Sequence, residues 1–178
     1  MNEKKSVLYS IKPYYFYLIA EGIKTIEVRG RIPLSMNWDR GIWLHVTRDK
    51  KSFERIPEER RWFYEKYLGK VGAHFKCNTI LTYRLNPDDW TYDDYPYLLN
   101  EPSTGKDCLS PSELIATLRD REIGYGLVIS NLFVLDKPLE YKDFTNAGDN
   151  KPLKAVPQSY VYVLNGIVQF EGSTEEDV

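Results

Sequence analysis

The chain has 178 residues, of which 42% are apolar and 28% charged, and this composition is typical of one ordinary globular domain. It contains no apolar run long enough to span a membrane, and we expect neither a secretion signal nor a membrane partner. The formal net charge is −2, but residues 1–51 hold ten Lys and Arg against five Asp and Glu, a balance of +5 that leaves −7 elsewhere. This asymmetry predicts one anion-facing side on an acidic protein.

Cysteine and histidine are too few and too scattered to form a zinc site. The two cysteines, Cys77 and Cys108, have no nearby histidine partner, and the two histidines are His45 and His74. We therefore expect no metal and no other cofactor. We also expect both thiols to be reduced, both histidines to have structural roles, and the protein to be cytoplasmic.

The N-terminal region begins with a short strand followed by a short helix. Residues 7–12 have the composition of a strand, which Pro13 ends. Because proline lacks the N–H that would be unpaired in the first turn, it suits the start of a helix, which we expect over residues 13–21. Gly22 then stands where a helix C-cap is expected.

Two further strands are predicted from a clean alternation of apolar and polar residues. In residues 25–29 the polar side chains share one face, namely Thr25, Glu27 and Arg29. In residues 41–47 the aliphatic side chains point to one face, and Trp43 and His45 share the other. Trp43 and His45 could therefore line a ligand-binding wall, and Trp43 is equally suited to a core position.

The remaining elements, in chain order, are a helix at 57–67, a β-like stretch at 71–83, a helix opening at Ser110, and strands at 126–135, 158–163 and 166–170. Glu113 follows Ser110 at the spacing of a capping box. Residues 86–107 are acidic, aromatic and rich in turn residues, which favours a long loop or insertion. The tail at 173–178 is typical of disorder. Since no βαβ rhythm appears, we expect a mixed α+β fold, mainly of strands, in one domain over residues 1–172.

Three stretches together carry a family resemblance. The first combines S-I-K-P at residues 10–13 with G-I-K-T-I-E-V-R at 22–29. The second is G-L-V-I at 126–129, with Pro138 beyond it, and the third is A-V-P-Q-S-Y-V-Y at 155–162. This combination resembles ASCH domains, and the third stretch is similar to one found in phage-type members. The resemblance implies a PUA-like pseudo-β-barrel with a few short flanking helices and a cleft beside the first helices.

The resemblance also implies a role in binding RNA or a nucleotide, as a single-stranded segment or a modified base in a basic cleft. Arginine and lysine suit phosphates, a carboxylate accepts hydrogen bonds from a base's exocyclic amine, and aromatic rings stack on bases. The acidic 86–107 stretch would repel a long phosphate backbone and so favours a small ligand. The candidate ligand-binding residues are Ser10, Lys12, Lys24, Glu27, Arg29, Arg31, Trp43, Gln158, Ser159 and Tyr160.

Three other interpretations remain open at this point. Some small bacterial relatives resemble amidohydrolases acting on N4-acylated cytidine, with the motif G-x-K-T-x-T-x-R. In that case Lys24, Thr25 and Glu27 would be catalytic, although Glu27 occupies the place of the second threonine. A second alternative is a protein-interaction module that uses the aromatic stretch at 90–97. The third is structural, with Glu27 and Arg29 forming a plain surface ion pair.

Overall fold

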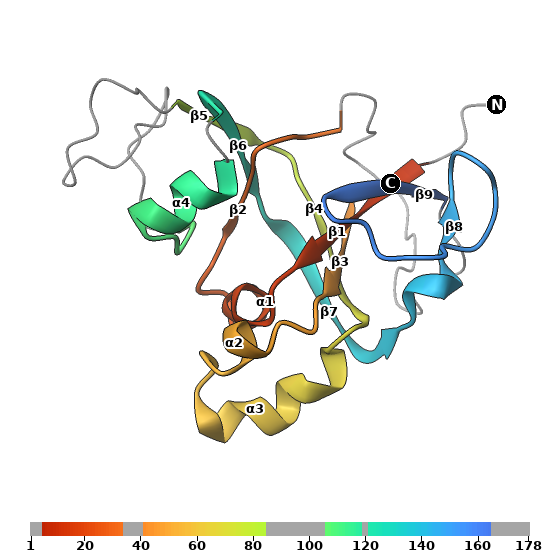
Figure 1. The fold of residues 1–178 in the computed structure, drawn as a ribbon, viewed down its shortest axis with the longest axis horizontal. Coiled ribbons are helices and arrows are strands. Elements are labelled where there is room, and N and C mark those ends of the chain that lie inside the picture. The colour runs from red at the N-terminus through yellow and green to blue at the C-terminus, as the bar shows by residue number, and fades with distance from the viewer. Residues whose placement is uncertain (1–4, 34–40, 85–105, 119–120, 165–178) are drawn as a thin grey trace, which may run out of the picture.

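The computed structural model describes residues 5–33, 41–84, 106–118 and 121–164 (Figure 1). Its strands are β1 (Lys5–Ile11), β2 (Ile26–Arg29), β3 (Ile42–Val46), β4 (Val71–Lys76), β5 (Ile80–Arg84), β6 (Ile123–Val128), β7 (Ser130–Leu139), β8 (Thr145–Asn146) and β9 (Tyr160–Leu164). Its helices are α1 (Pro13–Ala20), α2 (Lys50–Phe53), α3 (Glu58–Tyr64) and α4 (Pro111–Leu118), with short 3-10 turns at Glu65–Tyr67 and Tyr141–Asp143. Most of the predicted insertion, the strand at 166–170 and the tail at 173–178 lie outside the described residues.

The strands form two sheets. The larger has six strands in the order β7-β4-β3-β1-β9-β8, and the smaller has three in the order β2-β6-β5. β1 and β3 pair in parallel, and the other pairs are antiparallel. In Figure 1, α4 lies beside β2 at the left of the view, and α1, α2 and α3 gather below the strands. The expected α+β class, mainly of strands with a few short helices, is confirmed, and among the described strands neither sheet closes on itself.

Two long predicted strands each divide between the sheets. The stretch at 71–83 becomes β4 in the large sheet and β5 in the small one, and the stretch at 126–135 becomes β6 and β7. The two crossings lie together, because the Val128 N–H donates to the Thr79 carbonyl at 3.0 Å. The Ser130 hydroxyl likewise donates to the Lys76 carbonyl at 2.8 Å. Alternation of side chains could not reveal where each strand passes from one sheet to the other, because the residues before and after that point are equally strand-like.

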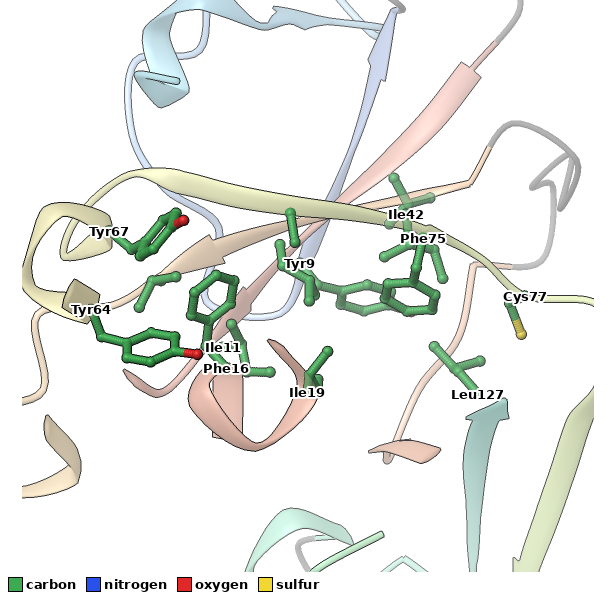
Figure 2. Close-up of a cluster of buried hydrophobic side chains, with 14 of the residues drawn as sticks. Tyr9, Ile11, Phe16, Ile19, Ile42, Tyr64, Tyr67, Phe75, Cys77 and Leu127 are labelled. Carbon is green, nitrogen blue, oxygen red and sulfur yellow. The ribbon is translucent and has the colours of Figure 1, made fainter. Parts of the chain in front are cut away.

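The core lies mainly between α1 and one face of the large sheet. Phe16 of α1 is 1% exposed and packs against Tyr67, with ring centroids 5.0 Å apart. Figure 2 shows this cluster, with Leu127 entering it from β6 and so joining the small sheet to the large one. α1 ends at Ala20, Glu21 is its C-cap, and Gly22 follows with a φ of 72°, the left-handed conformation typical of a glycine at the end of a helix.

The helix predicted to open with a capping box at Ser110 is also present. Ser110 precedes α4, its N–H donates to the Glu113 carboxylate at 2.9 Å, and the Glu113 N–H donates to the Ser110 hydroxyl at 3.3 Å. The Arg55 guanidinium also donates to this carboxylate, at 2.7 Å. α4 is thereby tied to the segment that follows α2. None of the described helices is long and apolar enough to cross a membrane.

Candidate functional site

Lys24, Glu27 and Arg29 form a continuous chain of charges at the start of the small sheet, and we call these three residues the triad. The Lys24 ammonium lies 3.5 Å from Oε2 of Glu27, and Nη2 of Arg29 lies 2.9 Å from Oε1. Lys24 is 2% exposed and Glu27 is 6% exposed. Glu27 and Arg29 are therefore not a surface ion pair, which corrects the structural interpretation of these two residues.

The local sequence explains how the triad forms. The alternation in β2 sends Ile26 and Val28 into an apolar cluster with Tyr83, so the polar residues between them face the other way. Lys24 precedes the strand, and its N–H donates to the Leu18 carbonyl of α1 at 2.9 Å. Removing several charges from water is unfavourable unless they are paired, and such groups gather at functional sites.

A second segment, residues 106–109, contacts the triad at Lys24, and we call it the anchor segment. The Lys24 ammonium donates a hydrogen bond to the Asp107 carbonyl oxygen. The Asp107 carboxylate accepts hydrogen bonds from the Tyr83 hydroxyl at 3.2 Å and from the Leu109 N–H at 3.1 Å. Asp107 is 2% exposed. Sequence reasoning missed it, because Asp107 stood at the end of an apparently solvated acidic stretch.

Arg29 lies against β1 and against an aromatic pair. Its Nη2 donates to the Ser10 carbonyl at 2.9 Å, and its guanidinium carbon lies 4.5 Å from the centroid of the Tyr9 ring. The Tyr9 ring meets that of Tyr160 edge to face, with centroids 5.7 Å apart. Tyr160 was predicted as a site residue. Tyr9 was not, and the alternation of β1, which directs Tyr9 toward the same core as Val7, gave it no distinguishing signal.

Two buried polar atoms where Arg29 meets Tyr9 have no hydrogen-bond partner among the residues that the structure describes. They are the Tyr9 hydroxyl oxygen and the Arg29 Nε. Burial raises the pKa of Tyr9 above its ordinary value, an effect that the neighbouring Arg29 charge lessens, so the hydroxyl remains protonated at neutral pH. Unpaired buried polar groups are uncommon in proteins and favour a role other than stability.

Replacing Tyr9 with phenylalanine is expected to raise the free energy of unfolding by about 1 kcal/mol, because it removes a buried hydroxyl that has no partner. Urea unfolding would measure the change. The matched control is Tyr67→Phe, since the Tyr67 hydroxyl donates to the Leu135 carbonyl at 2.8 Å. That substitution should lower the free energy by about 1 kcal/mol. A loss of stability in Tyr9→Phe as large as in the control would show that the Tyr9 hydroxyl is paired.

Other predicted residues lie around the triad at varying depth. The Ser10 hydroxyl donates to the Pro157 carbonyl at 2.7 Å, which brings the segment before β9 to β1. Lys12 is exposed, and its ammonium lies 3.7 Å from the Asp49 carboxylate. Arg31 follows β2 and is exposed. Thr25 is half-buried, and its N–H donates to the carbonyl of Lys106 in the anchor segment at 2.9 Å.

The strand predicted at 158–163 begins later than expected. β9 starts at Tyr160, so Gln158 and Ser159 precede it, and both are exposed. Their neighbour Pro157 contacts Ser10, whose carbonyl accepts from Arg29. Gln158 and Ser159 therefore lie within a few residues of the site without a described contact to the triad.

Trp43 does not belong to this site, which corrects its assignment as a stacking wall. It is 4% exposed and packs edge to face against Phe144, with centroids 5.2 Å apart, and against His74 at 4.6 Å. Its cluster is distinct from the one that contains Tyr9. Because both faces of β3 are buried, alternation alone could not show which face meets a ligand.

His45 and His74 are buried too, and no acidic, cysteine or histidine group in the described part of the chain is arranged to hold a metal ion.

Comparison with known proteins finds similar structures but no similar sequences. No family model and no curated protein matches the chain by sequence. The chain is similar in structure to ASCH from Zymomonas mobilis, at 18% identity and a TM-score of 0.53, over 89% of this chain and 87% of that one. A serine-to-alanine variant of that protein aligns with a TM-score of 0.55 at 18% identity, over 90% of this chain and 89% of that one.

A tyrosine-to-phenylalanine variant of the same protein aligns at 18% identity with a TM-score of 0.53, over 87% of each chain. Similarity at this level of identity concerns the fold, because one fold can carry several activities. The N-terminal motif at residues 10–29 had predicted the same relationship from sequence. The chain therefore has the fold of an ASCH protein.

Proposed function

We propose that the chain is a member of the ASCH family and binds a nucleobase, within a nucleotide or a short single strand of RNA, at the triad. The observation that carries this proposal is the burial of Lys24 and Glu27, linked to the half-buried Arg29, beside Tyr9 and Tyr160. Base recognition requires fixed hydrogen-bonding groups next to aromatic or guanidinium surfaces on which a base can stack. The triad and its two tyrosines combine both features.

The charge balance around the triad favours a base over a phosphate. Lys24 and Arg29 contribute two formal positive charges, and Glu27 and Asp107 contribute two negative ones, so these groups sum to zero. The Lys24 ammonium is also enclosed by the Glu27 carboxylate, the Asp107 carbonyl and the Tyr15 ring, whose centroid is 5.6 Å away. A neutral, enclosed group of this kind attracts a polyanion weakly but can direct hydrogen bonds.

Glu27 is the best candidate for reading the base. An ionised carboxylate has about four acceptor positions, and Lys24 and Arg29 each approach a different oxygen of Glu27. Acceptor capacity therefore remains for the exocyclic amine of a base, a pairing that carboxylates make with cytosine. Arg29, stacked on Tyr9, presents a planar guanidinium on which a base can also stack.

Exposed cations nearby would serve the phosphates. The Lys12 side chain is 61% exposed and immediately follows β1, and Arg31 is exposed just beyond β2. Phosphate contacts at such positions are sensitive to salt, whereas hydrogen bonds to a buried base are much less so. The two kinds of contact can therefore be separated experimentally.

Replacing Arg29 with methionine is expected to weaken nucleotide binding at least about tenfold, because both the stacking plane and the link to Glu27 are lost. Isothermal titration with cytidine, cytidine monophosphate and RNA oligomers of about eight nucleotides would measure it. The titrations are made at about 50 and about 200 mM salt.

Lys12→Ala should weaken RNA and monophosphate binding at the lower salt while leaving cytidine binding unchanged.

The control is Lys142→Ala, which removes an exposed lysine from the 3-10 turn Tyr141–Asp143 and should leave every affinity unchanged. Binding that survives in Arg29→Met, or that Lys142→Ala weakens equally, would reject the triad as the binding site. If the unaltered protein binds none of the probes, the proposed function itself is wrong.

A second candidate function is hydrolysis of an N4-acylated cytidine. The observation in its favour is the approach of the buried Lys24 amine to the Glu27 carboxylate at 3.5 Å, an arrangement suited to proton transfer within a dry site. Incubation with N4-acetylcytidine, followed by absorbance, tests it on the same protein samples. Turnover that disappears in Lys24→Ala would support this function, and unchanged substrate at high protein concentration would exclude it.

A further inference from the structure

The anchor segment holds both the side chain of Lys24 and the start of β2. The Asp107 carbonyl, 83 positions beyond Lys24, accepts from its ammonium. The Lys106 carbonyl accepts from the N–H groups of Thr25 at 2.9 Å and Ile26 at 3.2 Å. The Lys24 amine is therefore held by a distant part of the chain as well as by Glu27 of the strand that follows it.

The carboxylate of Asp107 determines where its own carbonyl points. By accepting from the Leu109 N–H two residues later, it closes a turn of the kind that aspartate commonly forms with its own backbone. Cys108, inside this turn, has a φ of 55°, which is unfavourable for a residue with a side chain. A strained turn persists only where its surroundings hold it, and strain of this kind gathers at functional sites.

Tyr83 provides that restraint from β5. Its hydroxyl donates to the Asp107 carboxylate, and its side chain is fully buried. Burial, and secondarily the Asp107 charge, raises the pKa of Tyr83, so the hydroxyl stays a donor at neutral pH. Gly126 of β6 makes room for the ring, because a Cβ there would lie 2.6 Å from the ring's Cε2. The ring cannot shift far without meeting β6.

We propose that Asp107 and Tyr83 are positioning residues for Lys24. The Tyr83 hydroxyl holds the Asp107 carboxylate and so fixes the backbone turn at Asp107. The Asp107 carbonyl then accepts from the Lys24 ammonium, and that ammonium positions one oxygen of Glu27. The inference rests on the proposed function, in which the Glu27 carboxylate binds the base. It adds that the position of this carboxylate depends on Asp107 and Tyr83, which do not touch the ligand. The position of Lys24 itself, however, can be measured without any ligand.

The test is the reactivity of the Lys24 amine in the full-length protein. Reductive methylation with formaldehyde and a cyanoborohydride reductant, quantified by peptide mass spectrometry, reports how often the enclosed amine becomes accessible. Tyr83→Phe removes one hydroxyl and keeps the ring, and it is expected to raise the methylation rate of Lys24 about tenfold. Asp107→Ala should have at least the same effect, whereas Asp107→Asn, which can still pair with Tyr83 and Leu109, should remain near the native rate.

Tyr67→Phe is the matched control, because it too removes a buried hydroxyl that donates to an oxygen on another segment. Urea unfolding confirms that the two tyrosine variants lose similar stability. The inference is overturned if Tyr83→Phe leaves Lys24 as protected as in the native protein. It is equally overturned if Tyr67→Phe exposes Lys24 to the same degree, since general loosening would then explain the result.

A nucleotide titration of the same variants separates this inference from the proposed function. Increased methylation together with at least about tenfold weaker binding in Tyr83→Phe supports both. Increased methylation in a protein that binds no nucleotide even before substitution supports the positioning of Lys24 and rejects the proposed function. If binding weakens in Tyr83→Phe while Lys24 stays protected, the positioning role is wrong.

Discussion

Replacing Glu27 with alanine is expected to lower the free energy of unfolding by about 3–5 kcal/mol. The substitution leaves Lys24, whose side chain is 1% exposed, without a carboxylate, and it leaves Arg29, whose side chain is 16% exposed, with one partner fewer. An uncompensated charge in a poorly hydrated position is among the most unfavourable changes that one substitution can make. Urea or guanidinium unfolding followed by circular dichroism would measure the change.

A double substitution and an exposed ion pair serve as controls for Glu27→Ala. Adding Lys24→Met should recover part of the lost stability, because one of the unpaired cations is then removed. Glu54→Ala disrupts the exposed pair of Glu54 with Lys50, whose charged atoms are 3.9 Å apart, and should change stability by no more than about 0.5 kcal/mol. A loss of under about 1 kcal/mol in Glu27→Ala would mean that the cations reach solvent and that the triad is not enclosed.

Replacing Phe16 with alanine is also expected to lower the free energy of unfolding by about 3–5 kcal/mol. The ring is 1% exposed, and its centroid lies 6.2 Å from that of Tyr64 and 5.0 Å from that of Tyr67. Figure 2 shows the three side chains in one cluster. Its removal opens a cavity between α1 and the large sheet. Phe16→Leu, which retains most of the volume, should lose no more than about 1.5 kcal/mol by the same measurement.

A double-mutant cycle tests whether Phe16 fills the space that Gly72 leaves in β4. A Cβ at position 72 would lie 2.7 Å from the Phe16 ring and 2.8 Å from the Tyr67 ring. Gly72→Ala should therefore destabilise the native protein but cost less in the Phe16→Ala background, because one of the two clashes is gone. Additive effects of the two substitutions would contradict this packing.

Local chemistry along the chain was sufficient to predict several parts of the molecule. Proline at the first helical position, glycine after α1 and the pairing of Ser110 with Glu113 are signals carried by neighbouring residues, and all three stand as predicted. The alternation in β2 likewise placed Glu27 and Arg29 on one face. Such features depend on residues at most four positions apart, so an unfolded chain already contains them.

The predictions at Trp43 and at the two long strands required information that local sequence does not contain. Trp43 has a strand-like neighbourhood, but both faces of β3 are covered, and only packing decides which core receives the ring. The stretches at 71–83 and 126–135 each cross from one sheet to the other. Whether an apolar run continues or turns a corner depends on its pairing partners, which lie far away in the sequence.

The sequence by itself determined the ASCH-like order of helices and strands and the presence of lysine, glutamate and arginine side chains at the site. It could do so because motif spacing and strand alternation are local properties. Only the tertiary structure decided that Lys24 is enclosed, that Tyr9 stacks on Arg29, and that the anchor segment accepts a hydrogen bond from Lys24. These contacts join positions far apart in the chain, and Asp107 is 83 residues beyond Lys24. Burial and the cost of unpaired charge arise only when such segments meet, since they depend on how much water the assembled fold excludes.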